Sequence, residues 1–260
     1  MKQELIKSII KVGNSAGVIL PKNWVNGKAR VELIVKPLNI ERDILEILEP
    51  YLKDIIGIYL VGSYARGEQT ERSDVDVLVI TNKKTGRIKE GKYDILLITE
   101  DSISKAIENN ALPIIPMLKE ANALLNSKLI EKYKNTELNK KNLRLYIELG
   151  KSILRVNKAS IGIDKQWPSN CGDAVAYSLV LRLRSAYIID CIKKKKKWGN
   201  PGLLSLIKGI CGSLEAYEGY LRVKNDERAK ETLPIEEAEK LYDYVIKKIK
   251  EHEEWVKRKR

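Results

Sequence analysis

Two short motifs place residue types that are suited to phosphate and metal binding at the ends of neighbouring predicted strands. Gly62 and Ser63 follow an apolar run over residues 55–61 that predicts a buried strand, so a strand ends and a helix begins there. Asp74 and Asp76 begin a second apolar run, and because side chains alternate along a strand, the two carboxylates lie on the same face. Close carboxylates in a core-forming strand are costly unless a cation compensates them, and Mg²⁺ is the usual cation for oxygen ligands.

A third acid is available at Asp94, within a predicted strand over residues 93–98 that follows a basic, glycine-containing loop. Three carboxylates could hold two metal ions, which stabilise the attacking and the leaving oxygen of an in-line displacement at phosphorus. The turn at Gly62 and Ser63 offers backbone N–H groups to phosphates, and glycine allows their close approach. The motifs therefore outline a nucleoside triphosphate site, and the single histidine argues against zinc.

Residues 61–68 and 73–79 resemble the DNA polymerase β-type nucleotidyltransferases, in particular their minimal nucleotidyltransferase branch. The resemblance implies an α+β fold with a small mixed sheet, two Mg²⁺ ions, ATP as the nucleotide donor, and transfer of a nucleoside monophosphate with loss of pyrophosphate. By position, Asp74 and Asp76 would be metal ligands, and Asp94 would be the third ligand and accept the proton of the attacking hydroxyl. A degraded, inactive domain is the alternative.

Two arginines lie inside the same motif. Arg66 and Arg72 have guanidinium groups that suit the oxygens of a triphosphate, which would make them nucleotide-binding residues. Alternatively, they form ion pairs with Glu68, Glu71 or an aspartate of the site. The sequence leaves both interpretations open.

The formal net charge of +13 is unevenly distributed along the 260 residues. Residues 138–260 hold 27 basic and 16 acidic side chains, whereas residues 39–137 hold 14 and 17. Basic ends around an acidic middle suggest a polyanionic partner, although high solubility alone would also explain them. The sequence shows no secretion signal and no long uncharged apolar run, so we expect a cytoplasmic protein that does not span a membrane.

Residues 5–36 predict two short strands around a glycine-bounded turn, a short helix after Pro21 and a third strand over residues 31–35. This segment resembles the DNA-binding module of the AbrB and MazE type, in which two copies form one dimeric unit. The resemblance implies a homodimer and DNA contacts from four residues: Lys7, Lys11, Asn14 and Lys22. The alternative is a hairpin docked on the catalytic domain, with its lysines solvated.

The remaining pattern predicts the domain organisation. We expect the N-terminal β element over residues 1–37, a nucleotidyltransferase domain over residues 38–136 and a helical domain over residues 137–260. Within the middle domain, helices are predicted over residues 38–55, from Asp101 onward and over residues 121–133.

Helical periodicity in the last domain predicts a four-helix bundle that resembles HEPN domains, the helical partners of minimal nucleotidyltransferases. The predicted helices cover residues 138–157, 170–197, 201–222 and 234–258. His252 has no arginine at the spacing that HEPN ribonucleases use, so ribonuclease activity is disfavoured and His252 is expected to be solvated.

The acceptor of the nucleotide is left open by the sequence. Family resemblance offers a protein tyrosine in a toxin–antitoxin context, or a small hydroxylated molecule of the aminoglycoside class. A different hypothesis is a DNA-binding transcriptional regulator whose nucleotidyltransferase domain senses nucleotide and is catalytically weak.

Overall fold

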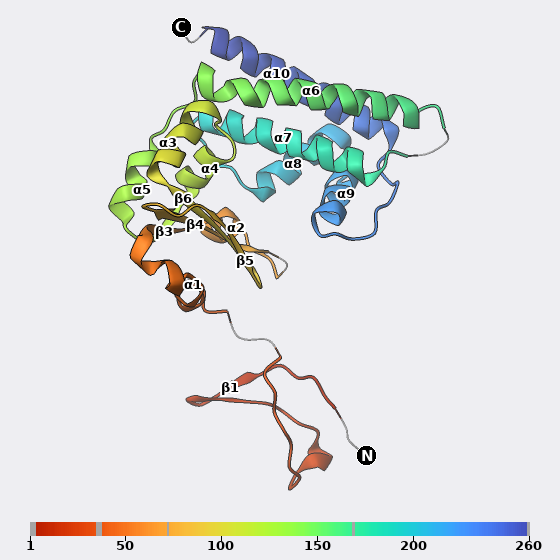
Figure 1. The fold of residues 1–260 in the computed structure, drawn as a ribbon. Helices are drawn as coiled ribbons and strands as arrows, with labels where there is room; N and C mark the ends of the chain where they lie inside the picture. The colour runs from red at the N-terminus through yellow and green to blue at the C-terminus, as the bar shows by residue number, and fades with distance from the viewer. Residues whose placement is uncertain (1–3, 35–37, 72, 168–169, 259–260) are drawn as a thin grey trace. The chain divides into compact units, whose positions relative to one another are not determined.

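The protein is described by a computed structural model that covers residues 4–34, 38–71, 73–167 and 170–258. It divides into two compact units, Met1–Asn39 and Ile40–Arg260 (Figure 1).

The N-terminal unit contains a small antiparallel hairpin. Strands β1 (Ile10–Val12) and β2 (Ser15–Gly17) pair with Lys11 opposite Ala16, and Gly13 in the turn has a φ of +58°. A short 3-10 helix follows over Lys22–Trp24. The predicted third strand is absent from residues 31–34, and Val35 lies outside the described residues. None of the described residues 4–34 is buried, so this unit has no core of its own.

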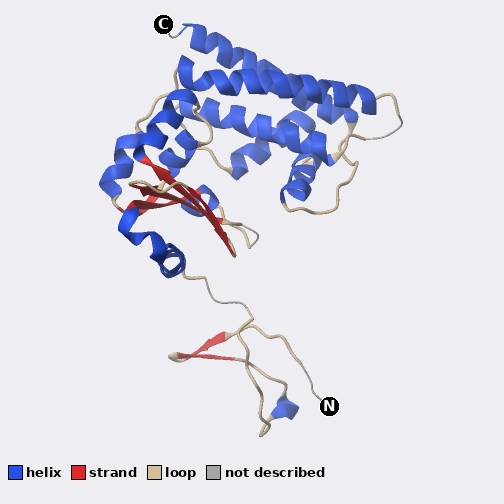
Figure 2. Cartoon of the chain, in the orientation of Figure 1, coloured by secondary structure: helices blue, strands red, loops and turns tan. Residues whose placement is uncertain are grey.

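The unit Ile40–Arg260 contains a mixed five-stranded sheet with the order β5-β6-β4-β3-β7 (Figures 1 and 2). β4 and β6 are parallel, whereas the other neighbours are antiparallel. The strands are β3 (Ile55–Val61), β4 (Val75–Thr81), β5 (Gly86–Glu90), β6 (Tyr93–Thr99) and β7 (Asn122–Leu125). The α+β class and the three central strands are confirmed.

The two edge strands differ from the prediction. β5 forms where a basic loop was expected, and β7 occupies the start of the helix expected over residues 121–133. Both strands are largely exposed, so neither needs the apolar alternation that identifies a half-buried strand. In β5, the charged side chains of Arg87, Lys89 and Glu90 also protect the edge from pairing with another chain, whereas β7 has no charged residue.

Helices cover both faces of the sheet. On one face, Ile44 and Leu48 of α1 pack in a cluster with alternate residues of β4, including Val77. On the opposite face, Leu78 packs in a second cluster with Ile103 of α3 and other helical residues. The helices of this part are α1 (Ile40–Leu48), α2 (Gly62–Arg66), α3 (Glu100–Asn109), α4 (Ile114–Glu120) and α5 (Ser127–Lys134). A 3-10 turn, Glu49–Asp54, follows α1.

The described part of residues 137–260 forms five helices. They are α6 (Lys140–Asp164), α7 (Asp173–Lys193), α8 (Asn200–Cys211), α9 (Glu215–Lys224) and α10 (Ile235–Arg258). The single helix expected over residues 201–222 is interrupted at Gly212, whose φ of +92° ends α8 in the left-handed region. The buried cluster that begins in the sheet at Tyr59 continues into these helices as far as Val256.

His252 is fully buried, which contradicts the expectation that it is solvated. Its Nδ1 lies 3.0 Å from the Tyr146 hydroxyl, and its Nε2 lies 2.9 Å from Asp190 Oδ1. Burial alone would raise the pKa of Asp190, but hydrogen bonds from His252 and Lys248 hold that pKa well below its usual range. The pattern of charges along α10 concealed this polar cluster because its partners come from α6 and α7.

Among the described residues, no helix is both long and apolar enough to cross a membrane.

Candidate functional site

A glycine turn joins β3 to α2 and lies against a carboxylate of the next strand. Val61 pairs with Asp76 across β3 and β4, and Gly62 follows with a φ of +69°. A Cβ atom at Gly62 would lie 2.3 Å from Asp76 Oδ2. The position therefore requires glycine both for its backbone conformation and for the space that Asp76 occupies.

The three predicted acids gather at this end of the sheet. Asp76 is in register with Asp94 across the parallel strands β4 and β6, and Asp74 precedes β4 by one residue. Burial raises the pKa of Asp76 to about 6, and the charges of Asp94 and Asp74 contribute to the increase. The carboxylates are therefore close enough to repel one another, which is the condition that a bound cation relieves.

Asp94 is engaged by a residue that the sequence analysis did not single out. Arg87 of β5 donates from Nε and Nη2 to the two oxygens of Asp94, each at 2.5 Å, and Lys89 Nζ lies 3.9 Å away. Arg87 was missed because its segment was expected to be a loop, whereas β5 pairs with β6 directly beside Asp94.

The donor atoms fit magnesium in part. Asp74 and Asp76 offer the carboxylate oxygens that Mg²⁺ prefers. Asp94 can join them only if its pair with Arg87 opens, and within the described ranges no three acidic, histidine or cysteine side chains converge as a ready metal site. The arrangement thus differs from the expected three-carboxylate metal site because Asp94 is hydrogen-bonded to Arg87.

Arg66 belongs to an ion-pair cluster under the turn. Its Nε donates to Glu68 at 2.9 Å and its Nη1 to Glu120 at 2.6 Å, and the Arg66 and Glu120 side chains are only 12% and 10% exposed. The backbone N–H of Gly62 donates to the other oxygen of Glu120 at 2.8 Å. The sequence left two roles open for Arg66, binding a triphosphate or forming ion pairs, and in the structure Arg66 forms ion pairs. Arg72 lies outside the described residues.

A segment from the helical region reaches the same cluster. Trp198 Nε1 donates to Glu120 at 3.2 Å, and the backbone N–H of Asn200 donates to Glu68 at 3.0 Å. A Cβ at Gly199 would lie 1.9 Å from Glu68 Oε1, so a larger residue there would force this carboxylate to move. Sequence reasoning missed Glu120 and Trp198 because they are far from the turn in the chain and belong to no shared motif.

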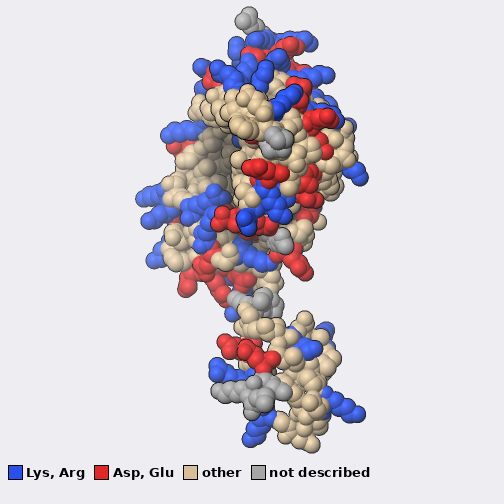
Figure 3. Space-filling model, turned by 90° about the vertical axis from the view of Figure 1, so that its right-hand side faces the viewer, with Lys and Arg blue, Asp and Glu red and all other residues tan. Residues whose placement is uncertain are grey.

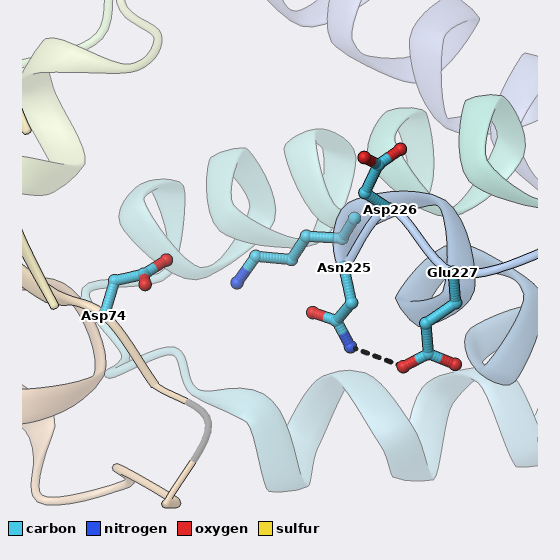
Figure 4. Close-up of a pocket in the computed structure, with 5 residues that line it drawn as sticks. Asp74, Asn225, Asp226 and Glu227 are labelled. Carbon is cyan, nitrogen blue, oxygen red and sulfur yellow. Dashed lines mark hydrogen bonds between the residues drawn. The ribbon is translucent and has the colours of Figure 1, made fainter. Parts of the chain in front are cut away.

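A pocket of about 480 Å³ separates Asp74 from the end of α9. Figure 4 shows Asp74 on one side and Asn225, Asp226 and Glu227 on the other. Lys224 also lines this pocket, and its positive charge acts to lower the pKa of Asp76 against the larger effect of burial. The helical region therefore contributes one wall of the pocket beside Asp74, which the sequence analysis did not predict.

The remaining predicted residues lie as follows. Ser63 is partly buried in the first turn of α2. The side chains proposed for DNA contact are all exposed in the N-terminal unit: Lys7, Lys11, Asn14 and Lys22. On the face shown in Figure 3, Lys and Arg side chains are interspersed with Asp and Glu, so this view shows no continuous patch of one sign.

Residues 41–149 match the family model of the nucleotidyltransferase domain, and this range contains the turn and the acids described above. No curated protein sequence matches the chain. The crystal structure of a nucleotidyltransferase-like protein from Exiguobacterium sibiricum is similar over 82% of this chain and 75% of its own, with 14% sequence identity and a TM-score of 0.34. The resemblances to AbrB and MazE modules and to HEPN domains stay predictions.

Proposed function

We propose that the protein is a Mg²⁺-dependent nucleotidyltransferase that moves AMP from ATP to a hydroxyl acceptor and releases pyrophosphate. The observation that carries this proposal is the position of Asp76. Its carboxylate is packed over Gly62, is in register with Asp94 and is close enough to both other acids for their charges to raise its pKa. Repelling carboxylates beside a glycine turn are costly for a domain that binds no cation.

Asp74 and Asp76 would hold the metal ions, with Asp94 as the third ligand. When bound, Mg²⁺ would neutralise the charge that develops on the transferring phosphoryl group. We assign the triphosphate tail to the turn at Gly62 and Ser63. Because Glu120 accepts the Gly62 N–H, that amide supports the turn, and Ser63 is left as the polar residue of the turn for the phosphates.

Asp94 would also accept the proton of the attacking hydroxyl. Its bidentate pair with Arg87 keeps the carboxylate oriented in the absence of substrate. Arg87 is 62% exposed on an edge strand, so it can swing away when a cation approaches Asp94. We therefore expect Arg87 to compensate the negative charge of the acid cluster until metal and nucleotide bind.

The test is transfer of labelled nucleotide. The protein is incubated with Mg²⁺ and each α-labelled nucleoside triphosphate, followed by intact-mass analysis and by release of labelled pyrophosphate from a γ-labelled substrate. Asp76→Asn should lower the rate by at least about 100-fold, since it removes a metal ligand. Asp101→Asn, an exposed acid on α3, is the matched control. Equal rates for Asp76→Asn and the wild type would refute the assignment.

The same incubation addresses the acceptor. A protein tyrosine in a toxin–antitoxin context and a small aminoglycoside-like molecule are both hydroxyl acceptors that the proposal allows. A mass increase on the protein itself or on a partner protein would select the first. Pyrophosphate release that depends on an added aminoglycoside, without protein modification, would select the second.

A second candidate function, DNA binding, is favoured by the N-terminal unit. Its large apolar side chains are exposed, with Ile6 at 77% and Val31 at 70%, and none of its described residues is buried. A hairpin without a core needs a second surface to fold stably. We propose that two copies pair through this unit and bind DNA through Lys7, Lys11, Asn14 and Lys22, so that the protein could act as a nucleotide-sensing transcriptional regulator.

DNA binding is tested by gel shifts with the DNA upstream of the protein's own gene. Lys11→Gln should weaken a salt-sensitive shift, whereas Lys250→Gln, a lysine of α10, should not. Sedimentation should give a dimer for the full chain. A monomer that gives no shift at low salt would refute this candidate, and it would leave the transferase proposal intact.

A further inference from the structure

The pocket between Asp74 and the end of α9 contains a lysine that has no partner among the residues that the structure describes. Lys224 lines the pocket, and among the described residues no carboxylate forms an ion pair or hydrogen bond with its ammonium group. Two residues earlier, Arg222 is fully engaged: it pairs with Asp173 at 2.8 Å and also contacts Glu215 and Thr232. The two cations at the end of α9 thus differ, because Arg222 connects α9 to α7 whereas Lys224 is exposed in the pocket.

Two other described cations near the acids, Arg66 and Arg87, are already paired. Arg66 is bound by Glu68 and Glu120. Arg87 is bound by both oxygens of Asp94. In the part of the chain that the structure describes, Lys224 is therefore the unpaired cation that lines the pocket beside Asp74.

Its charge already acts on the acid cluster. Lys224 opposes the increase in the pKa of Asp76, so the ammonium lies within electrostatic reach of that carboxylate. It nevertheless forms no ion pair with Asp74, which lines the same pocket. A pocket of about 480 Å³ lies in the size range of small-molecule sites.

We propose that Lys224 is a substrate-binding residue that contacts the triphosphate tail of the nucleotide across the pocket from Asp74. This inference rests on the proposed function. A triphosphate that approaches three carboxylates needs cations besides the metal, and an ammonium on a flexible stem is suited to bind phosphate as a point charge. The helical region would thus take part in binding the donor and would be more than a structural partner of the sheet.

The experiment compares binding of Mg·ATP to the wild type, Lys224→Gln and Lys224→Arg by isothermal titration calorimetry. Loss of one charge-assisted hydrogen bond should weaken Mg·ATP binding about 10- to 100-fold in Lys224→Gln. Lys224→Arg keeps the charge and should stay within about 3-fold of the wild type. Lys250→Gln makes the same change on an exposed position of α10 and should have no effect.

Two competitors show which part of the nucleotide Lys224 contacts. Lys224→Gln should weaken the binding of inorganic tripolyphosphate by the same factor as the binding of ATP, and it should leave the affinity for adenosine unchanged. Thermal unfolding should be the same in all variants because the side chain is exposed and unpaired. An equal loss for adenosine, or a lower melting temperature in Lys224→Gln, would overturn the inference in favour of a base contact or a structural role.

The failures of the two proposals are distinguishable. If the wild type binds Mg·ATP and transfers nucleotide while Lys224→Gln binds it equally well, only the role of Lys224 is refuted. If the wild type neither binds Mg·ATP nor releases pyrophosphate, the proposed function and the role of Lys224 are refuted together.

Discussion

Replacing Asp76 by Asn should stabilise the protein while it removes activity. In the folded state the pKa of Asp76 is about 6, compared with an ordinary value of 3.8, because burial and the charges of Asp94 and Asp74 disfavour its ionised form. At about 1.4 kcal/mol for each pH unit, this difference corresponds to about 3 kcal/mol of destabilisation when the carboxylate is charged. The neutral amide of Asn avoids that cost, so the free energy of unfolding at pH 7.5 should rise by about 3 kcal/mol.

The effect has a defined pH dependence. Below pH 3.8 Asp76 is protonated in both the folded and the unfolded state, and no cost arises. Between that pH and about 6 the unfolded state loses the proton first, so the stability of the wild type falls as pH rises; above about 6 the cost is complete. The difference between Asp76→Asn and the wild type should therefore be large at pH 7.5 and close to zero near pH 4.

Thermal unfolding measures the difference, and an increase of about 6 °C in melting temperature is expected at pH 7.5 without metal. Mg²⁺ at about 100 times its dissociation constant should stabilise the wild type by about 2.7 kcal/mol and the variant less, which narrows the gap. Asp101→Asn, in which the lost acid is exposed, should change stability by less than about 0.5 kcal/mol. A variant that is less stable than the wild type at pH 7.5 would contradict the view that these carboxylates repel one another.

Gly62→Ala should abolish nucleotide transfer because the new Cβ would displace the Asp76 carboxylate. The control is Gly67→Ala, which has the same φ of +69° but open space around it. This control should lose about 1 kcal/mol of stability and keep its activity. Glu120→Gln should lower the free energy of unfolding by about 2 kcal/mol, measured by urea denaturation, while Glu148→Gln in an exposed helical pair should have almost no effect. His252→Ala should cost about 3 kcal/mol in the same assay, since it empties a fully buried site and the buried Tyr146 and the partly buried Asp190 each lose a hydrogen bond. An unchanged midpoint would show that the cluster contributes nothing to stability.

The parts of the site that lie close together in sequence were predictable. Gly62, Asp76 and Asp94 occur at strand ends with apolar runs beside them, and strand alternation and strand pairing suffice to bring them together. Their local patterns are strong because each strand is buried. The fold class and the central strands followed from the same patterns.

The parts that depend on distant contacts were not predictable. Glu120 reaches Gly62 only because α4 packs beside the turn, and Trp198 reaches Glu120 only because the segment before α8 folds back on it. Arg87 is in an edge strand without apolar alternation, so its position beside Asp94 has no signature in the sequence. His252 lies on a charged helix, and its burial depends on partners from two other helices.

The hydrogen bond of Trp198 restricts how the helical wall of the pocket beside Asp74 can move. Trp198 fastens the segment after α7 to Glu120, whereas α9 is tied to the beginning of α7 through Arg222 and Asp173. Because α7 has 21 residues and is therefore about 30 Å long, these two attachments are separated by nearly its full length. If the pocket widens, we therefore expect the displacement to be smallest near Trp198 and largest at the end of α9. A bulky acceptor would then enter on that side.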